Sequence, residues 1–346
     1  MNGSISGVEE NGRRRHAGEQ RAAVAWVESP LQMLCAVEAH HAGLVGDRLR
    51  VVSRARLPAL AATRRELSRL ALPPGVTLDA PRRVMSRPRG PATWVVGDAF
   101  SGRVQLSWLT SFPHRVVIVD DGLATIRLLE LLGAPGPRPL LRARARPGPL
   151  RTALGAAASV RLRAAARSGR LSIFTALPVP DPLAEAVRKT GARLIRHDFA
   201  WLRAQPPAPL PGERTIVLGT SLVRNGLIHR DPYFAWLADV GAGGPVAYFP
   251  HRREDPADLE RVKRQPGITV YDGGGPAEMT LRGLSAGQRV LSLPSTALAS
   301  LRVLLSSRGV PVDAVEVPEE WWTAKADPAL RSHLQMVLRH DTGAAR

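Results

Sequence analysis

Two adjacent carboxylates, Asp120 and Asp121, are the residues of this sequence best suited to chemistry. They follow the apolar segment 115–119, which is typical of a buried strand, and Gly122 after them permits a tight turn. Neighbouring buried acids are costly and repel each other, so we expect the pKa of one to rise toward the range of a general base. The plainer interpretation is an aspartate that caps the next helix and shapes its turn.

A histidine and an arginine follow another apolar segment, 246–249. His251 and Arg252 at the end of a strand suit an anionic group such as a phosphate. A lone histidine is more often structural, but the neighbouring arginine favours a functional role. We therefore predict that this turn binds an anion.

Small and hydroxyl-bearing residues lie at two further strand ends. Ser295 and Thr296 follow the segment 289–293 and open a helix, whose free N–H groups would complete a phosphate site. An ordinary helix N-cap is the alternative for either hydroxyl. The turn Gly219-Thr220-Ser221 would let a ligand approach the backbone closely.

Four other polar residues accompany predicted helix starts. Ser29 with Pro30 begins a helix, and Gln32 completes a near capping box. A helix start does not explain why the acid Glu28 ends the preceding strand. Glu278 stands early in another helix, where it either favours the helix dipole or holds a sugar hydroxyl.

Short apolar segments alternate with helical patterns along most of the chain, as in parallel sheets covered on both faces. Before residue 204 the pattern predicts strands at 22–28, 50–53, 94–97, 115–119, 171–176 and 193–197, and helices at 31–44, 57–70 and 125–132. After residue 213 it predicts strands at 215–219, 246–249, 268–271, 289–293 and 312–317, and helices at 232–240, 255–263, 276–284, 296–306 and about 327–339.

The proline-rich segment 204–213 is the clearest linker in the chain. We predict a disordered tail at 1–20, an N-terminal Rossmann-like domain at 21–203 and a C-terminal Rossmann-like domain at 214–346. The predicted fold class is thus α/β, with two Rossmann-like domains facing across a cleft. Open α/β sheets bind ligands beyond the carboxyl ends of their strands, where the polar residues above lie.

Composition excludes several classes of protein. The single cysteine, Cys35, rules out a disulfide scaffold, and no apolar run approaches the ~20 residues of a membrane helix. The polar N-terminus lacks the apolar core of a signal peptide, so we expect a cytoplasmic protein. No Asp-x-Asp motif, zinc spacing or glycine-rich dinucleotide fingerprint is present, so we predict neither a metal nor a nicotinamide cofactor.

The net charge of +18 is unevenly distributed. Segment 133–170 carries nine arginines and no acid, about half of that charge. Aromatic residues make up only 5%, and no basic–aromatic pattern for base stacking is visible, so we predict no nucleic-acid partner. The plainer interpretation of this arginine-rich insert is a solvated loop and helix face. The alternative is a surface for an acidic glycan or for peripheral contact with the inner face of an anionic membrane.

The candidate acids lie in the first half of the chain and the anion-binding residues in the second. This separation suits an enzyme that holds a nucleotide-sugar in one domain and presents a base from the other. Over about 22–320, the sequence resembles the bacterial sialyltransferases and polysialyltransferases of GT-B fold, closest to glycosyltransferase family 52 and the polysialyltransferase group. The resemblance rests on five short motifs: Asp120-Asp121-Gly122, Pro250-His251-Arg252, Ser295-Thr296, Ser-Pro-Leu-Gln at 29–32 and Pro-x-Glu at 276–278.

This resemblance implies an inverting transfer of sialic acid or a related sugar from a CMP-sugar to a glycan hydroxyl. It implies no essential metal and no cofactor besides the CMP-sugar co-substrate. An acid of the first motif would deprotonate the acceptor hydroxyl; the resemblance favours Asp121, with Asp120 as the alternative. His251 would bind or protonate the departing CMP phosphate.

The remaining donor contacts are implied in the same way. Ser295 and Thr296 would hold the phosphate, Glu278 would contact the cytidine ribose, and Gly219-Thr220-Ser221 would line the donor site. Arg252 stands where the family motif has a proline, so the shape of this loop and the identity of the donor sugar stay open.

Three alternatives remain at this point. The first is another GT-B glycosyltransferase that uses a UDP- or GDP-sugar. The second is a non-catalytic protein that binds a nucleotide or an anionic polymer. The third is a two-domain nucleotide-sugar epimerase, which would need no acceptor.

Overall fold

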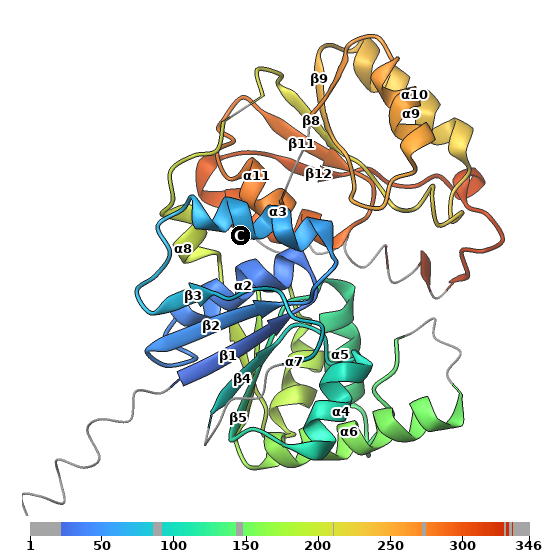
Figure 1. Ribbon diagram of the computed structural model, residues 1–346. Helices are drawn as coiled ribbons and strands as arrows, with labels where there is room; N and C mark the ends of the chain where they lie inside the picture. The colour runs from blue at the N-terminus through green and yellow to red at the C-terminus, as the bar shows by residue number, and fades with distance from the viewer. Residues whose placement is uncertain are drawn as a thin grey trace, which may run out of the picture.

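A computed structural model describes residues 22–85, 92–142, 148–209, 211–271, 275–328, 330–331 and 334. The predicted tail at 1–20, part of the arginine-rich insert and most of the predicted helix at 327–339 lie outside these residues. The described chain forms two parallel sheets with helices on their faces (Figure 1).

The first sheet has seven parallel strands in the order β3-β2-β1-β4-β5-β6-β7. Its first four strands along the chain are β1 (Ala22–Val27), β2 (Arg48–Ser53), β3 (Val76–Leu78) and β4 (Thr93–Val96), followed by β5 (Arg115–Val119), β6 (Leu171–Thr175) and β7 (Arg193–Arg196). Strand order reverses between β1 and β4, as in a Rossmann fold. Continuous burial of β1, β5 and β6 fits a sheet covered on both faces.

In the described part of the chain, seven helices pack around this first sheet. The helices α2 (Pro30–His41), α3 (Pro58–Ser68) and α8 (Ala200–Arg203) pack in one core cluster, and α4 (Gly102–Thr110), α5 (Leu123–Gly133), α6 (Pro149–Arg167) and α7 (Asp181–Arg188) pack in another. Successive strand residues alternate between the two clusters: Ala25 faces the first and Trp26 the second.

The second sheet has five parallel strands in the order β10-β9-β8-β11-β12. These strands are β8 (Thr215–Leu218), β9 (Val246–Phe249), β10 (Ile268–Val270), β11 (Arg289–Ser292) and β12 (Val312–Ala314). The helices around them are α9 (Arg230–Ala242), α10 (Pro256–Lys263), α11 (Ala277–Leu281) and α12 (Thr296–Leu305), with 3-10 turns at Ser306–Arg308 and Glu319–Trp321. Both sheets therefore follow Rossmann order, and the predicted fold class, α/β with two Rossmann-like halves, is confirmed.

The two halves share one hydrophobic core cluster, which includes residues of α2, α3 and α8 together with α11 and α12. Arg203, at the end of α8, donates hydrogen bonds to the carbonyls of Val303 and Leu304 at the last turn of α12. These contacts join the C-terminal end of α12 to the first domain.

The sequence missed several elements of the first half. The helices α4, α6, α7 and α8 and the three-residue strand β3 were not predicted. Alanine and arginine dominate α6, so its buried side, with Ala158, Leu162 and Ala165, gives only a weak apolar pattern, and β3 is a short edge strand with no buried residue.

Candidate active site

Polar residues from both domains lie at the two places where strand order reverses. Glu28 and Asp98 follow β1 and β4, which flank the reversal in the first sheet. Gly219 follows β8 and Ser295 closely follows β11, which flank the reversal in the second. A reversal leaves a crevice between diverging connections, so both positions are suited to ligands.

Asp121 follows the end of β5, where the first domain meets the second. Its Oδ1 accepts a hydrogen bond from Ser29 Oγ at 3.0 Å, and the side chain of Gln32 donates to the same carboxylate. Burial, and then the negative charge of Asp98, raise the pKa of Asp121 from 3.8 to about 6; the hydrogen bonds and Arg142 oppose the rise. At neutral pH this carboxyl is mostly ionised yet basic enough to accept a proton.

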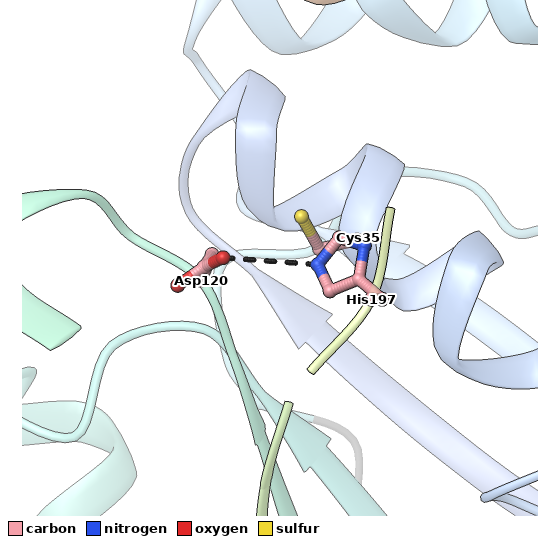
Figure 2. A group of neighbouring side chains, drawn as sticks. All are labelled: Cys35, Asp120 and His197. Carbon is pink, nitrogen blue, oxygen red and sulfur yellow. Dashed lines mark ion pairs between the residues drawn. The ribbon is translucent and has the colours of Figure 1, made fainter. Parts of the chain in front are cut away.

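Asp120 points elsewhere, although it is the next residue along the chain. Its two carboxylate oxygens accept hydrogen bonds from Thr175 Oγ1 at 2.5 Å and from the Ala176 amide at 2.6 Å. His197 Nε2 lies 3.7 Å away, and Cys35 completes the group in Figure 2. Asp120 is 2% exposed, so its carboxylate stabilises the turn through these buried hydrogen bonds and does not face a substrate.

Among the described residues, one group of potential metal ligands lies close together. It consists of Cys35, Asp120 and His197, whose ligand atoms are within 4.8 Å of one another. Three ligands fall short of the four in a structural zinc site, and the Asp120 carboxylate already serves Thr175 and Ala176. We assign no metal to this group. Independence of a metal stays a prediction.

The predicted group at 28–32 surrounds Asp121. Glu28 accepts hydrogen bonds from Trp26 Nε1 at 2.8 Å, Ser101 Oγ at 2.7 Å and Arg54 at 3.0 Å. Gln32 accepts from the Glu28 amide through its oxygen, which turns its NH₂ group toward Asp121. Glu28 and Gln32 thus brace the first turn of α2, whose N-cap Ser29 contacts the candidate base.

The His251 turn follows β9 in the second domain. His251 Nδ1 accepts a hydrogen bond from the Arg253 amide at 3.1 Å, so the neutral ring carries its proton on Nε2. Burial, then Arg252 and Arg253, lower the pKa of His251 to about 4. At neutral pH it is therefore a neutral hydrogen-bond donor, which suits binding of a phosphate better than protonation of one.

Arg252 brings positive charge toward the candidate base. Burial and the neighbouring Arg253 lower its pKa, while attraction to Asp121 in the other domain opposes them. The base and the predicted phosphate-binding turn therefore influence each other across the domain boundary.

Glu254, which sequence reasoning missed, fastens two turns of the predicted donor site. Its carboxylate accepts hydrogen bonds from the amides of His251, at 2.9 Å, and Thr220, and from Tyr248 Oη. A Cβ on Gly219 would lie 2.7 Å from both carboxylate oxygens, so only glycine fits there. Burial, opposed by these hydrogen bonds, raises the pKa of Glu254 to about 7.

The start of α12 meets the acidic turn. Ser295 is the N-cap in an extended conformation and makes no side-chain capping bond, and Thr296 is the first helical residue. Gly122 has φ +65°, and a Cβ on it would lie 2.7 Å from Thr296 Oγ1. The carboxylate-bearing turn and the predicted phosphate-binding helix end are therefore in direct contact.

Two predicted donor residues have other surroundings. Glu278 is 3% exposed, and its carboxyl accepts a hydrogen bond from Ser300 on α12, so this placement does not support contact with a ribose. Ser221 is half-buried beside Thr220, whose hydroxyl accepts from the Leu222 amide at 3.1 Å.

Asp98, Arg54 and Arg142 are further site residues that the sequence reasoning missed. Asp98 pairs with Arg142 at 2.5 Å, and Arg54 pairs with Glu28 at 3.0 Å. Asp98 and Arg54 each directly follow a predicted strand, so the same strand-end signal would have found them. Arg142 lies in an irregular segment without any such signal.

A surface depression of about 960 Å³ lies at the opposite end of the second sheet. Thr215 and Arg289, the first residues of β8 and β11, line it, so it lies at the amino ends of the strands. Ligands of parallel sheets bind at the carboxyl ends, and we do not take this depression as the active site.

Comparisons with known proteins give fold-level similarity only. No family model and no curated protein sequence matches the chain. Solved structures with a similar fold include a UDP-glucose: anthocyanidin 3-O-glucosyltransferase in complex with UDP, with 10% identity, a TM-score of 0.44 and coverage of 94% of this chain and 91% of that one. Phytolacca americana UGT2 has 13% identity, a TM-score of 0.46 and coverage of 91% and 83%.

Acinetobacter baumannii MurG has 10% identity and a TM-score of 0.35, with coverage of 92% of this chain and 83% of that one. Similarity at this level does not assign a donor, an acceptor or a reaction. A functional assignment therefore depends on the residues of the site.

Proposed function

We propose that this protein is an inverting, metal-independent glycosyltransferase that transfers sialic acid or a related sugar from a CMP-sugar to a glycan hydroxyl. The observation that supports the proposal most is the placement of Asp121. This carboxyl, with its pKa raised to about 6, lies in a turn that contacts the start of α12 in the other domain. A base therefore adjoins a predicted phosphate site.

In the proposed reaction, Asp121 accepts the proton of the acceptor hydroxyl as its oxygen attacks the anomeric carbon. The bond from that carbon to the phosphate oxygen breaks, and CMP leaves with the electron pair. Attack opposite the leaving group inverts the anomeric centre. One general base of this kind contributes about 10²–10⁴ to the rate.

The leaving phosphate gains negative charge, which this chain has groups to stabilise. His251 offers its Nε2–H, Arg252 offers a guanidinium, and Ser295 and Thr296 offer hydroxyls beside the free amides of α12. The Arg252 guanidinium can offset charge on the single leaving phosphate, and the neutral N–H and O–H donors can stabilise it by hydrogen bonds. The choice of CMP over UDP or GDP depends on the motif resemblance.

The test is release of CMP from CMP-sialic acid by the purified protein, with and without a glycan acceptor, beside parallel reactions with UDP- and GDP-sugars. We expect CMP release that Asp121→Asn abolishes while CMP still binds and raises the melting temperature. Turnover of only a UDP- or GDP-sugar would establish the first alternative. Binding without turnover of any donor would establish the non-catalytic one.

A further inference from the structure

Helix α6 (Pro149–Arg167) exposes one continuous side. Leu150 is 87% exposed and Val160 is 50% exposed, and Ala153, Arg161 and Arg167 are exposed with them. Leu150, Ala153, Val160 and Arg167 follow one another at spacings of three or seven residues, which places them along one face of a helix, and Arg161 borders that face. The opposite side, which includes Ala158, Leu162 and Ala165, is buried in the core.

The neighbouring helix α4 (Gly102–Thr110) packs beside α6 (Figure 1) and has exposed residues of its own; we call the exposed residues of the two helices the α4–α6 face. Arg151 of α6 donates to Gln105 Oε1 at 2.5 Å and to the Phe100 carbonyl at 2.7 Å. Leu106, next to Gln105, is 56% exposed. Among the described residues, three of the four most exposed large hydrophobic side chains thus lie on α4 and α6; the fourth is Val84.

The charge of this surface has one sign. Neither α4 nor α6 contains a carboxylate, and exposed Arg103, Arg161 and Arg167 provide cations. Other arginines nearby are bound inward: Arg163 donates to the carbonyls of Leu131 and Ala134. The outward arginines of the insert are therefore a separate group from those that hold the fold.

Exposed leucine and valine among arginines, without an acid, are typical of a helix that lies on an anionic membrane, with its apolar side chains in the headgroup region. A surface that binds single-stranded nucleic acid by stacking would need exposed aromatic rings, whereas Trp108, the only aromatic residue of α4 and α6, is buried. We propose that the α4–α6 face docks on an anionic membrane surface. This proposal is independent of the proposed function.

The experiment is co-sedimentation of the full chain with vesicles of phosphatidylcholine alone or mixed with phosphatidylglycerol. We expect binding only to the mixed vesicles, weakened by salt because charge attraction is screened. Arg161→Gln with Arg167→Gln removes two cations and should lower the partition coefficient about 30-fold. Leu150→Ser with Val160→Ser should lower it about 10-fold or more at constant charge.

Arg48→Gln with Arg264→Gln is the matched control, since both arginines are exposed, Arg48 begins β2 and Arg264 is the C-cap of α10. This pair removes the same charge and should leave partitioning nearly unchanged. Equal loss in the control and the α6 arginine variant would overturn the proposal, because net charge alone would then explain binding. Binding that is indifferent to Leu150 and Val160, or equal capture by a soluble polyanion, would also overturn it. Vesicle binding requires no donor turnover, so its failure is distinguishable from failure of the enzymatic proposal.

Discussion

Replacing Asp121 with asparagine should abolish turnover and at the same time stabilise the folded protein at neutral pH. Asparagine keeps the shape of the side chain but can neither ionise nor accept the acceptor proton. In the wild type, burial raises the pKa of this carboxyl from 3.8 to about 6. Keeping the carboxyl ionised above that pH therefore lowers the free energy of unfolding.

The magnitude follows from that shift, which is roughly two pKa units at about 1.36 kcal/mol per unit. Ionised Asp121 therefore costs about 3 kcal/mol of folding free energy above about pH 7. Because the folded pKa is the higher one, this cost is absent below about pH 4 and develops as pH rises through about 6. The NH₂ group of the new asparagine cannot accept the hydrogen bond from the NH₂ group of Gln32, and this loss offsets part of the gain. We therefore expect the free energy of unfolding to rise by about 1–3 kcal/mol.

Urea unfolding of wild type and variant at several pH values between about 4 and 8 measures this difference. Asp120→Asn is the matched control: both Asp120 oxygens accept hydrogen bonds, so an amide there would face a donor and destabilise the fold by about 1–3 kcal/mol. In wild type, kcat/KM should rise through about pH 6 as Asp121 loses its proton. A pH-independent effect of Asp121→Asn on stability, or normal turnover by the folded variant, would refute the reasoning.

Three further substitutions test the donor side and the domain contact. His251→Ala should raise the KM for the donor more than it lowers kcat, since the ring is a neutral donor to phosphate; a large fall in kcat with unchanged KM would instead indicate acid catalysis. Glu254→Ala should loosen the turns at Gly219 and His251 and raise the donor KM, without moving the pH profile that Asp121 sets; an unchanged KM contradicts this role. Gly122→Ala combines a φ of +65° with a contact of 2.7 Å to Thr296, so urea unfolding should show a loss of about 1–3 kcal/mol. Wild-type stability would show that the contact yields easily.

The position of the candidate site was predicted from the rule that parallel sheets bind ligands at the carboxyl ends of their strands. Apolar segments fixed the strands well: β5 and β9 have the predicted bounds, and most others differ by a residue or two. Once strands are placed, the residues after them share an edge of the sheet, which is why Asp121, His251 and Ser295 could be selected as candidates without a structure.

The orientation of each side chain could not be predicted in the same way. Asp120 and Asp121 are the same residue type, and only partners distant in the sequence distinguish them. Thr175 and His197 lie beside Asp120, whereas Ser29 and Gln32 donate hydrogen bonds to Asp121. In the sequence, Glu254 is simply one of several charged residues in a loop. Its role depends on the Gly219 turn, which lies far away in the chain, so the local sequence did not reveal it. Local pattern contains no information on such contacts.

Helix α12 also has a mechanical consequence. Arg203 holds the carbonyls at its last turn, while Thr296 at its first turn only touches Gly122. A ten-residue helix is about 15 Å long, so a tilt of about 10° about the Arg203 end would displace Thr296 by about 3 Å. Such a tilt would separate the turn of Asp121 from the start of α12 by about the width of one water molecule, so the spacing between the candidate base and the predicted phosphate site depends on how firmly the Arg203 end of α12 is held.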